Sequence, residues 1–323
     1  TGVQTCALPI YFNVANSRTD PRRDYMSVEQ ISPTVTPDIT VMGDVILDRY
    51  WHATVSRTNP EAPGVVCNVA SATSSLGGCG AVAAICHGLG LAVSVGCAVA
   101  PDREGDEVVE MLCQVADGGG VILATMPQTT MKQRVIANGQ LMHTRFDFEE
   151  IAEVDRLTSR HLQLLPIGKV ILVADYGKGF CTDAVLRRIF RIGKRAGVPV
   201  IVDPARGRSP LAYRGATALK LNASEARQIT GQDPAQSAEW LSTFLECAVI
   251  VTDGSEGMFF SHAGEHWHQQ AVPSRVVDVT GAGDTVLAAV GLGFVRSLGW
   301  KKTMSLAAEL AAQQVGIHGV APV

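Results

Sequence analysis

The stretch "KVILVAD", residues 169–175, decides the fold class of this chain. It is a nearly continuous run of β-branched and apolar residues that ends on a carboxylate, as is typical of a strand buried on both faces of a sheet. Helix-like segments, such as 183–196 and 224–231, separate several runs of this kind. The other runs are "ITVMGDVIL" (39–47), "VPVIVDP" (198–204), "ATALKLN" (216–222) and "CAVIVTDG" (247–254). This alternation predicts an α/β fold in which helices cover both faces of a mainly parallel sheet.

Composition limits the class of protein. The chain has 323 residues, of which 46% are hydrophobic, enough for a sizeable core. Its net charge of −4 and its lack of a Lys/Arg block argue against nucleic-acid binding. No apolar run approaches the ~20 residues of a membrane-spanning helix, so we expect no membrane segment. Eight cysteines without CxxC spacing are typical of buried thiols in a reducing compartment, so we expect a cytoplasmic protein.

The first 37 residues differ from the rest. They are rich in Pro, Ser, Thr and Arg and show no sustained hydrophobic period, so we expect residues 1–37 to form a poorly ordered tail. The opening "TGVQTCALPI" resembles translated sequencing-adapter sequence rather than a native start. We therefore predict a single folded domain over residues 38–323.

One internal region also breaks the alternation of strands and helices. Residues 130–148 form two extended runs joined at Asn138-Gly139, a strong hairpin signal. A second extended piece, 51–68, is able to pair with this hairpin. We predict a β-sheet lid made by segments of about 50–68 and 128–148; a plain extension of the main sheet is the alternative.

Polar residues end the apolar runs. Ligands of parallel sheets bind beyond the carboxyl ends of the strands, so these residues are expected to face a ligand. They are Asp175, Asp203, Asn222 and Asp253.

The stretch "DVTGAGDT", residues 278–285, carries the chemistry. Gly281, Ala282 and Gly283 keep the backbone free of bulk, and the helix expected after them would present unpaired N–H groups to an anion. The helix dipole alone could account for Asp284, but a capping acid does not need the preceding Gly-Ala-Gly. Together they predict phosphoryl transfer, in which the N–H groups hold the transferred group and Asp284 accepts a hydroxyl proton. The glycine signatures of dehydrogenases, P-loop enzymes and serine hydrolases are missing.

These motifs resemble those of the ribokinase-like, or PfkB-type, carbohydrate kinases, in family order over roughly residues 38–323. The resemblance implies a three-layer fold with a mainly parallel central sheet and a small β-sheet lid, with ATP and Mg²⁺ as cofactors. It implies that Asp284 is the catalytic base and that Gly281, Ala282 and Gly283 form the anion hole. "GDVILD" resembles the first strand of the family, whose last aspartate, here Asp48, binds sugar hydroxyls.

The same resemblance assigns nucleotide, metal and sugar contacts. "NASE" resembles the family element that acts on Mg²⁺ and the ATP phosphates, with Glu225 reaching the metal through water. "TDGSEGM" resembles the nucleotide-binding turn that follows. The glycine pair of "LGGCGAVAA" belongs to the sugar site. The positions implied are Asn222, Ala223, Ser224, Glu225, Thr252, Gly254 and Gly257 for the nucleotide, and Gly77 and Gly78 for the sugar.

Within the family, "GDVILDRYW", "TTMKQRVIANGQLMHTRFDFEE" and "ADYGKG" resemble the kinases of D-glycero-D-manno-heptose 7-phosphate in bacterial ADP-heptose synthesis. That reaction moves the ATP γ-phosphate to the anomeric hydroxyl and gives the 1,7-bisphosphate. The phosphate of the substrate requires cations. Candidates in the matched segments are Lys132, Arg134, Arg145 and Lys178, and solvated surface positions are the alternative for each.

Ala81 departs from the family pattern, which has a sugar-binding asparagine there. A PfkB-type kinase for another sugar, sugar phosphate or nucleoside is therefore an alternative, and a non-catalytic sugar- or nucleotide-binding regulator is a second. The chain ends soon after the kinase region, so we expect it to lack the nucleotidyltransferase domain fused to some relatives. Lids pair in the family, which implies a homodimer.

Overall fold

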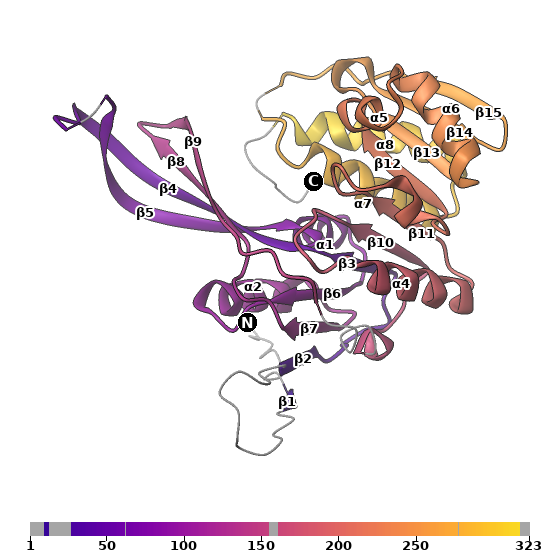
Figure 1. The fold of residues 1–323 in the computed structure, drawn as a ribbon, viewed down its shortest axis with the longest axis horizontal. Coiled ribbons are helices and arrows are strands. Elements are labelled where there is room, and N and C mark those ends of the chain that lie inside the picture. The colour runs from indigo at the N-terminus through magenta and orange to yellow at the C-terminus, as the bar shows by residue number, and fades with distance from the viewer. Residues whose placement is uncertain (1–9, 13–26, 62, 155–160, 277, 317–323) are drawn as a thin grey trace.

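The structure, a computed structural model, describes residues 10–12, 27–61, 63–154, 161–276 and 278–316. Within these residues the chain forms an 11-stranded sheet and a separate 4-stranded sheet (Figure 1). The large sheet has the strand order β1-β2-β7-β6-β3-β10-β11-β12-β13-β14-β15. Its strands are β1 (Ile10–Phe12), β2 (Ser27–Ile31), β3 (Ile39–Gly43), β6 (Val93–Val99), β7 (Gly120–Ala124), β10 (Val170–Ala174), β11 (Val200–Asp203), β12 (Ala218–Asn222), β13 (Ala248–Thr252), β14 (Met258–His262) and β15 (Glu265–Gln269).

The strands from β7 to β13 are parallel, and the pairs at both edges are antiparallel. Side chains alternate across the sheet, so each central strand supplies two cores. In β10, Val170, Leu172 and Ala174 pack in one core, and Ile171 and Val173 pack in the other. All five are fully buried, which explains why the sequence run is continuously apolar.

Helices cover both faces of this sheet. One core contains residues of α1, α2, α7 and α8, and the opposite core contains residues of α4, α5 and α6. The bounds are α1 (Cys79–Gly88), α2 (Arg103–Val115), α4 (Asp183–Ala196), α5 (Ala223–Thr230), α6 (Pro234–Leu245), α7 (Ala282–Val295) and α8 (Trp300–Gln314), with 3₁₀ turns η1 (Leu162–Leu164), η2 (Pro210–Tyr213) and η3 (Gly254–Glu256). The predicted α/β fold with a mainly parallel sheet is confirmed.

The small sheet is the predicted lid. Its order is β5-β4-β8-β9, and its strands are β4 (Val45–Thr58), β5 (Val65–Gly78), β8 (Met131–Ala137) and β9 (Gln140–Phe148). Figure 1 shows these long strands projecting away from the helices and the large sheet. Asn138 and Gly139 both have positive φ, 51° and 79°, as the predicted type I′ hairpin requires. The lid strands extend beyond the predicted segment of about 50–68. Strand β4 begins at Val45, directly after β3 ends at Gly43, and β5 continues to Gly78.

The tail is only partly as expected. Residues 1–9 and 13–26 of the predicted poorly ordered segment lie outside the described residues. Strands β1 and β2 contradict the prediction, because β2 pairs with β7 from Ser27 to Ile31 and β1 pairs with β2 at the edge of the large sheet. In the described part of the chain, every helix is too short or too polar to cross a membrane.

Candidate active site

The N-terminus of α7 contains the residues predicted to form the anion hole. Gly281 precedes the helix with φ +77°, and its carbonyl accepts the first helical bond, from Thr285 N, at 2.8 Å. No side chain caps this helix end within the described residues. The N–H groups of Gly283 and Asp284 precede that first helical bond, so they can point at an anion. The structure therefore brings together the predicted anion hole and the predicted base.

Lys220 adds a cation that the motifs did not indicate. It lies near the end of β12, is 4% exposed, and its Nζ lies 2.6 Å from Asp203 Oδ2. A Cβ built on Gly283 would lie 2.9 Å from Lys220 Nζ, so the ammonium group rests directly against the glycine turn. Burial alone would lower the pKa of Lys220, but the Asp203 carboxylate outweighs it and raises the pKa. A charged residue within the buried run "ATALKLN" was the available signal, because buried charges require partners.

Asp284 is buried at 8% exposure and accepts a hydrogen bond on Oδ1 from the Tyr176 hydroxyl at 2.6 Å. Burial raises its pKa to about 6, with the Asp203 and Asp48 carboxylates adding to this, while Tyr176 and Lys220 oppose it. A carboxylate with this pKa is mostly ionised at neutral pH and is a stronger base than an exposed aspartate. Asp284 is thus equipped to take a proton.

An apolar cavity of about 530 Å³ opens beside the N-terminus of α7. Three of the predicted nucleotide residues line it, as do Ala282 and Gly283. The rest of the lining comes mainly from the segment 271–279 and from α8. Predominantly apolar walls of this size suit a flat aromatic base, with the phosphate-binding turn at one side. The three predicted residues are Thr252, Gly254 and Gly257.

The "NASE" residues lie outside this lining and open α5. Asn222 Oδ1 accepts from Glu225 N at 2.9 Å, and Glu225 Oε2 accepts from Asn222 N at 3.0 Å, which is a reciprocal capping box. This box uses one Glu225 oxygen and leaves Oε1, which lies 4.0 Å from Arg206 Nη2. A single free carboxylate oxygen near Asp203 fits a water-mediated contact to Mg²⁺ and would not supply a full ligand set.

The residues predicted to bind the sugar lie at the start of β4 and the end of β5. Asp48 in β4 is 8% exposed, and its carboxylate is paired with Arg134. A Cβ on Gly77 would collide with Asp48 Oδ2, so only glycine leaves room for this carboxylate. Gly78 has φ +59°, and a Cβ there would collide with the Asp44 carbonyl oxygen. Local packing near Asp48, the residue predicted to bind the sugar, therefore requires both glycines.

The four predicted cations lie close together. Asp48 is the cross-strand partner of Lys132, and Arg134 is that of Arg145. Burial lowers the pKa of Lys132, and the nearby Arg145, Lys178 and Arg134 lower it further, while Asp48 opposes this. Three of the cations have acidic partners: Arg134 with Asp48, Arg145 with Asp147, and Lys178 with Glu149. Among the described residues, Lys132 makes no ion pair, and its Nζ lies 5.6 Å from the Tyr176 ring centre.

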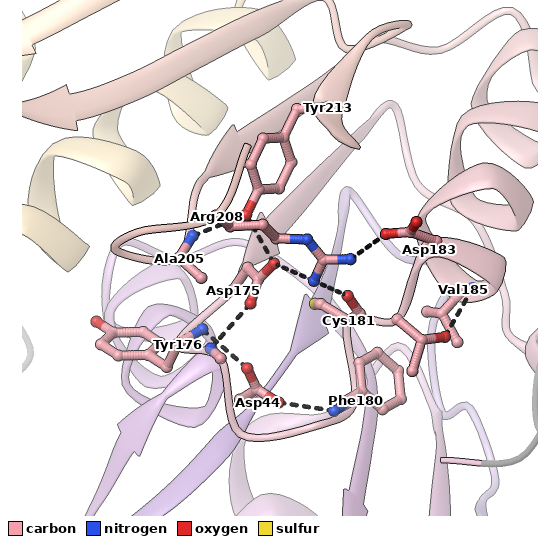
Figure 2. A network of polar contacts seen from close by, with 12 residues as sticks. Asp44, Asp175, Tyr176, Phe180, Cys181, Asp183, Val185, Ala205, Arg208 and Tyr213 are labelled. Carbon is pink, nitrogen blue, oxygen red and sulfur yellow. Dashed lines mark hydrogen bonds and ion pairs between the residues drawn. The ribbon is translucent and has the colours of Figure 1, made fainter. Parts of the chain in front are cut away.

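A buried network supports the loop after β10 (Figure 2). Asp175 accepts from Tyr213 Oη at 2.8 Å, Arg208 Nη1 at 3.2 Å and Gly177 N at 2.9 Å. Burial raises the pKa of Asp175 to about 6. Asp175 therefore anchors a loop rather than facing a ligand, which corrects the expectation for this strand end.

Asp44, Asp175 and Cys181 place their ligand atoms within 4.8 Å of one another, which invites a metal assignment. Asp44 already accepts from three backbone N–H groups, and Asp175 from three donors. Hydrogen bonds occupy both carboxylates, so this cluster is a scaffold.

Two further observations concern Ala81 and the segment that follows β11. Ala81 is fully buried in α1 and offers no polar side-chain atom to a sugar. Arg206 has a 70% exposed side chain near Glu225, whereas Arg208, which the motifs did not single out, is held by Asp175 and Asp183.

Comparison with known proteins identifies the family of the chain. Residues 36–322 match the family described as pfkB family carbohydrate kinase. The D-beta-D-heptose 7-phosphate kinase of Bordetella bronchiseptica is 34% identical over 88% of this chain and 93% of its own length. The bifunctional protein HldE of Desulfatibacillum aliphaticivorans is also 34% identical, over 88% of this chain but 61% of that protein. The chain thus spans about three fifths of the bifunctional relatives it matches.

Solved structures share the fold. Escherichia coli phosphofructokinase-2, solved with potassium, superposes with a TM-score of 0.72 at 15% identity, covering 88% of this chain and 94% of that one. Arabidopsis thaliana ribokinase, solved with ribose and ATP, superposes with a TM-score of 0.65 at 21% identity, covering 88% and 95%. The expected ribokinase-like arrangement of a large sheet and a smaller lid sheet is confirmed.

Proposed function

Because this chain belongs to the PfkB family of carbohydrate kinases, we propose that it transfers the γ-phosphate of ATP to the anomeric hydroxyl of D-glycero-D-manno-heptose 7-phosphate. The products are the 1,7-bisphosphate and ADP. The relative named D-beta-D-heptose 7-phosphate kinase, which this chain matches over nearly its whole length, supports this choice of acceptor.

The chemical step follows from Asp284 and the turn before it. The acceptor oxygen forms a bond to the γ-phosphorus, the bond from that phosphorus to the bridging oxygen of ADP breaks, and the hydroxyl proton passes to Asp284. The N–H groups at the start of α7 and the Lys220 ammonium face the charge of the transferred group. A base positioned in this way is typically worth ~10²–10⁴-fold in rate.

The apolar cavity beside α7 receives the adenine, which directs the phosphates toward Gly283. The free oxygen of Glu225 and the nearby Asp203 would hold Mg²⁺, in part through water. When bound, Mg²⁺ supplies charge neutralisation on the β- and γ-phosphates.

The observation that carries the proposal is the cation cluster formed by Lys132, Arg134 and Arg145 of the lid with Lys178 of the loop after β10. Lys132 is half-buried among Arg134, Arg145 and Lys178 and makes no ion pair with a described residue. Placing several cations around a poorly solvated lysine is unfavourable unless an anion joins them. The neighbouring Asp48 accepts hydroxyl donors, so the site suits a sugar that carries a phosphate. A plain sugar such as ribose would leave the Lys132 ammonium without an anion among the described residues.

The test is ADP release measured across heptose 7-phosphate, fructose 6-phosphate, ribose and a nucleoside. We expect turnover with the heptose phosphate and little with the unphosphorylated acceptors. Turnover confined to fructose 6-phosphate would overturn the choice of sugar. It would support the alternative of a PfkB-type kinase for another acceptor, which Ala81 favours. Tight binding without turnover on every acceptor would support a regulator instead.

We also propose a cytoplasmic homodimer that pairs through the lids. Exposed apolar side chains on the lid, Val69, Leu141 and Phe146 among them, support pairing of this surface. The described cysteines are all free thiols, in keeping with a reducing compartment. Sedimentation of the purified protein tests the assembly, and the mass of a single chain would contradict it.

A further inference from the structure

Tyr176 joins the catalytic aspartate to the buried loop network. Its hydroxyl donates to Asp284 Oδ1 at 2.6 Å, while its backbone N–H donates to Asp44 at 2.8 Å. Burial raises the pKa of the Tyr176 hydroxyl well above its ordinary value, with the Asp284 carboxylate adding to this, so the phenol stays protonated and remains a donor. A partly buried tyrosine with its hydroxyl fixed on a carboxylate is a rigid spacer between loop and base.

The loop that carries Tyr176 has little freedom. Asp44 accepts N–H bonds from Tyr176, Lys178 and Phe180, so one carboxylate, 132 residues away in sequence from Tyr176, holds three alternate amides. Gly179 has φ +108°, and a Cβ there would collide with the Ala152 carbonyl oxygen. Figure 2 shows Asp44 and Asp175 holding the loop from two sides, with the Tyr176 ring directed outward from it.

The two oxygens of Asp284 therefore differ. Oδ1 is held by Tyr176, whereas Oδ2 accepts no hydrogen bond from the described residues. The other charged groups that act on this carboxylate come from three further elements: Asp203 at the end of β11, Lys220 in β12 and Asp48 in the lid. Lys220 is bonded to Asp203 and Asp48 to Arg134, so Tyr176 alone among the described residues fixes the orientation of the carboxylate by a direct bond.

We propose that Tyr176 is a positioning residue for the base, and that its hydroxyl holds Oδ1 so that Oδ2 faces the acceptor hydroxyl. This rests on the proposed function, since it assumes that Asp284 receives the acceptor proton. Lys132 lies against the same tyrosine ring, and Lys178 follows it by two residues. One clamped loop thereby fixes the base relative to two of the cations proposed to bind the sugar phosphate, and alignment of this kind is a recognised source of rate.

The experiment compares Tyr176→Phe with Tyr213→Phe. Each change removes one buried tyrosine hydroxyl from a carboxylate, at 2.6 Å from Asp284 and at 2.8 Å from Asp175, and keeps the ring. The readouts are kcat, KM for ATP, the acid limb of the kcat/KM profile, and the pKa of Asp284 followed by ¹³C NMR of labelled aspartate. Thermal melts show whether each variant is folded.

We expect Tyr176→Phe to lower kcat about 10-fold, the effect of one hydrogen bond to a charged group, with KM for ATP unchanged. Because the hydroxyl lowers the pKa of Asp284, both the acid limb and the NMR titration should move to higher pH in this variant. Tyr213→Phe keeps the bond between Tyr176 and Asp284, so it should leave the NMR titration of Asp284 at the wild-type position even if the loop is loosened through Asp175. An unchanged titration in Tyr176→Phe, or an equal shift in the two variants, would overturn the positioning role.

The titration needs no substrate, so it separates this inference from the proposed function. Wild-type protein that is inactive on every acceptor would overturn the kinase assignment. The bond between Tyr176 and Asp284 would still be detected as a difference between the NMR titrations of the wild type and Tyr176→Phe. An active wild type together with an unshifted Asp284 titration in Tyr176→Phe would overturn the positioning role of Tyr176 and leave the kinase assignment standing.

Discussion

Replacing Lys220 with methionine tests the phosphate end of the site most directly. Methionine keeps much of the length of the side chain and removes the ammonium group that lies against Gly283 and 2.6 Å from Asp203. The change should have two separable effects. One is on the folded state, through Asp203, and the other is on the transferred phosphoryl group.

The effect on stability follows from burial. Lys220 is 4% exposed and the Asp203 side chain 15%, so the substitution leaves a poorly solvated carboxylate without its cation. Breaking a buried pair in this way costs about 3–5 kcal/mol. Asp203 would protonate more readily, because burial already raises its pKa and Lys220 is the group that opposes this. The cost should therefore be smaller in mildly acidic buffer than at neutral pH.

The effect on turnover is expected to be larger. Loss of one preorganised donor from the transferred group typically costs about 10²–10³-fold in kcat. Lys220 also lowers the pKa of Asp284, so the acid limb of Lys220→Met should lie at higher pH than that of the wild type.

The control is Lys220→Met combined with Asp203→Asn. This pair removes the unpaired carboxylate, so the unfolding free energy should recover, while kcat stays at or below that of Lys220→Met because the proposed Mg²⁺ contact of Asp203 is lost as well. ADP release and urea unfolding, measured on both variants, separate the two effects. A folded Lys220→Met protein with kcat within threefold of the wild type would refute the phosphate role. Recovery of kcat along with stability in the double variant would show that the loss came from misfolding.

Three further outcomes are expected. Asp284→Asn should lower kcat by ~10²–10⁴-fold with ATP affinity retained, as measured by calorimetry; near-normal turnover would remove its role as base. In the wild type, kcat/KM should rise with pH through about 6 and then level, because burial raises the pKa of Asp284 to about 6 and only the ionised form accepts a proton. A limb at the ordinary aspartate value would contradict this. Lys132→Met should raise KM for heptose 7-phosphate at least tenfold and leave KM for ATP unchanged. Lys169→Met is the matched control, because that lysine pairs with Asp38 on the surface, and an equal effect would argue against a phosphate site.

The elements that sequence predicted well are those whose pattern is local. The run at 169–175 contains β10, and the helix expected at 183–196 has the bounds of α4, because a continuous apolar run and an amphipathic period each require only neighbouring residues. The Asn138-Gly139 hairpin was predictable for the same reason. Strand β2 was not, since its short sequence becomes a strand only through pairing with β7 about 90 residues later.

In the site, too, the residues that could be predicted are those that lie close together in the sequence. Asp284 and its glycines occupy one contiguous motif, so their proximity could be predicted from spacing. Tyr176 and Lys220 reach Asp284 and Gly283 only because β10 and β12 end at the same edge of the sheet. Asp175 and Asp203 both stand at strand ends, but their roles differ. Asp175 anchors a loop because it accepts from Arg208 and Tyr213, which lie in later segments. Asp203 pairs with Lys220 instead.

The position of Asp284 explains why a lid and a sheet edge must cooperate. Of the groups that set its pKa, Asp203, Lys220 and Tyr176 belong to the large sheet and its loops, whereas Asp48 belongs to the lid. Asp48 is paired with Arg134, and both lie beside Lys132, which makes no ion pair with a residue that the structure describes. An anion that drew Arg134 toward the cation cluster would free Asp48 for sugar hydroxyls and increase its negative field at Asp284, which strengthens the base. Binding of the sugar phosphate would then be coupled to proton acceptance through residues that meet where β3 of the large sheet leads into β4 of the lid.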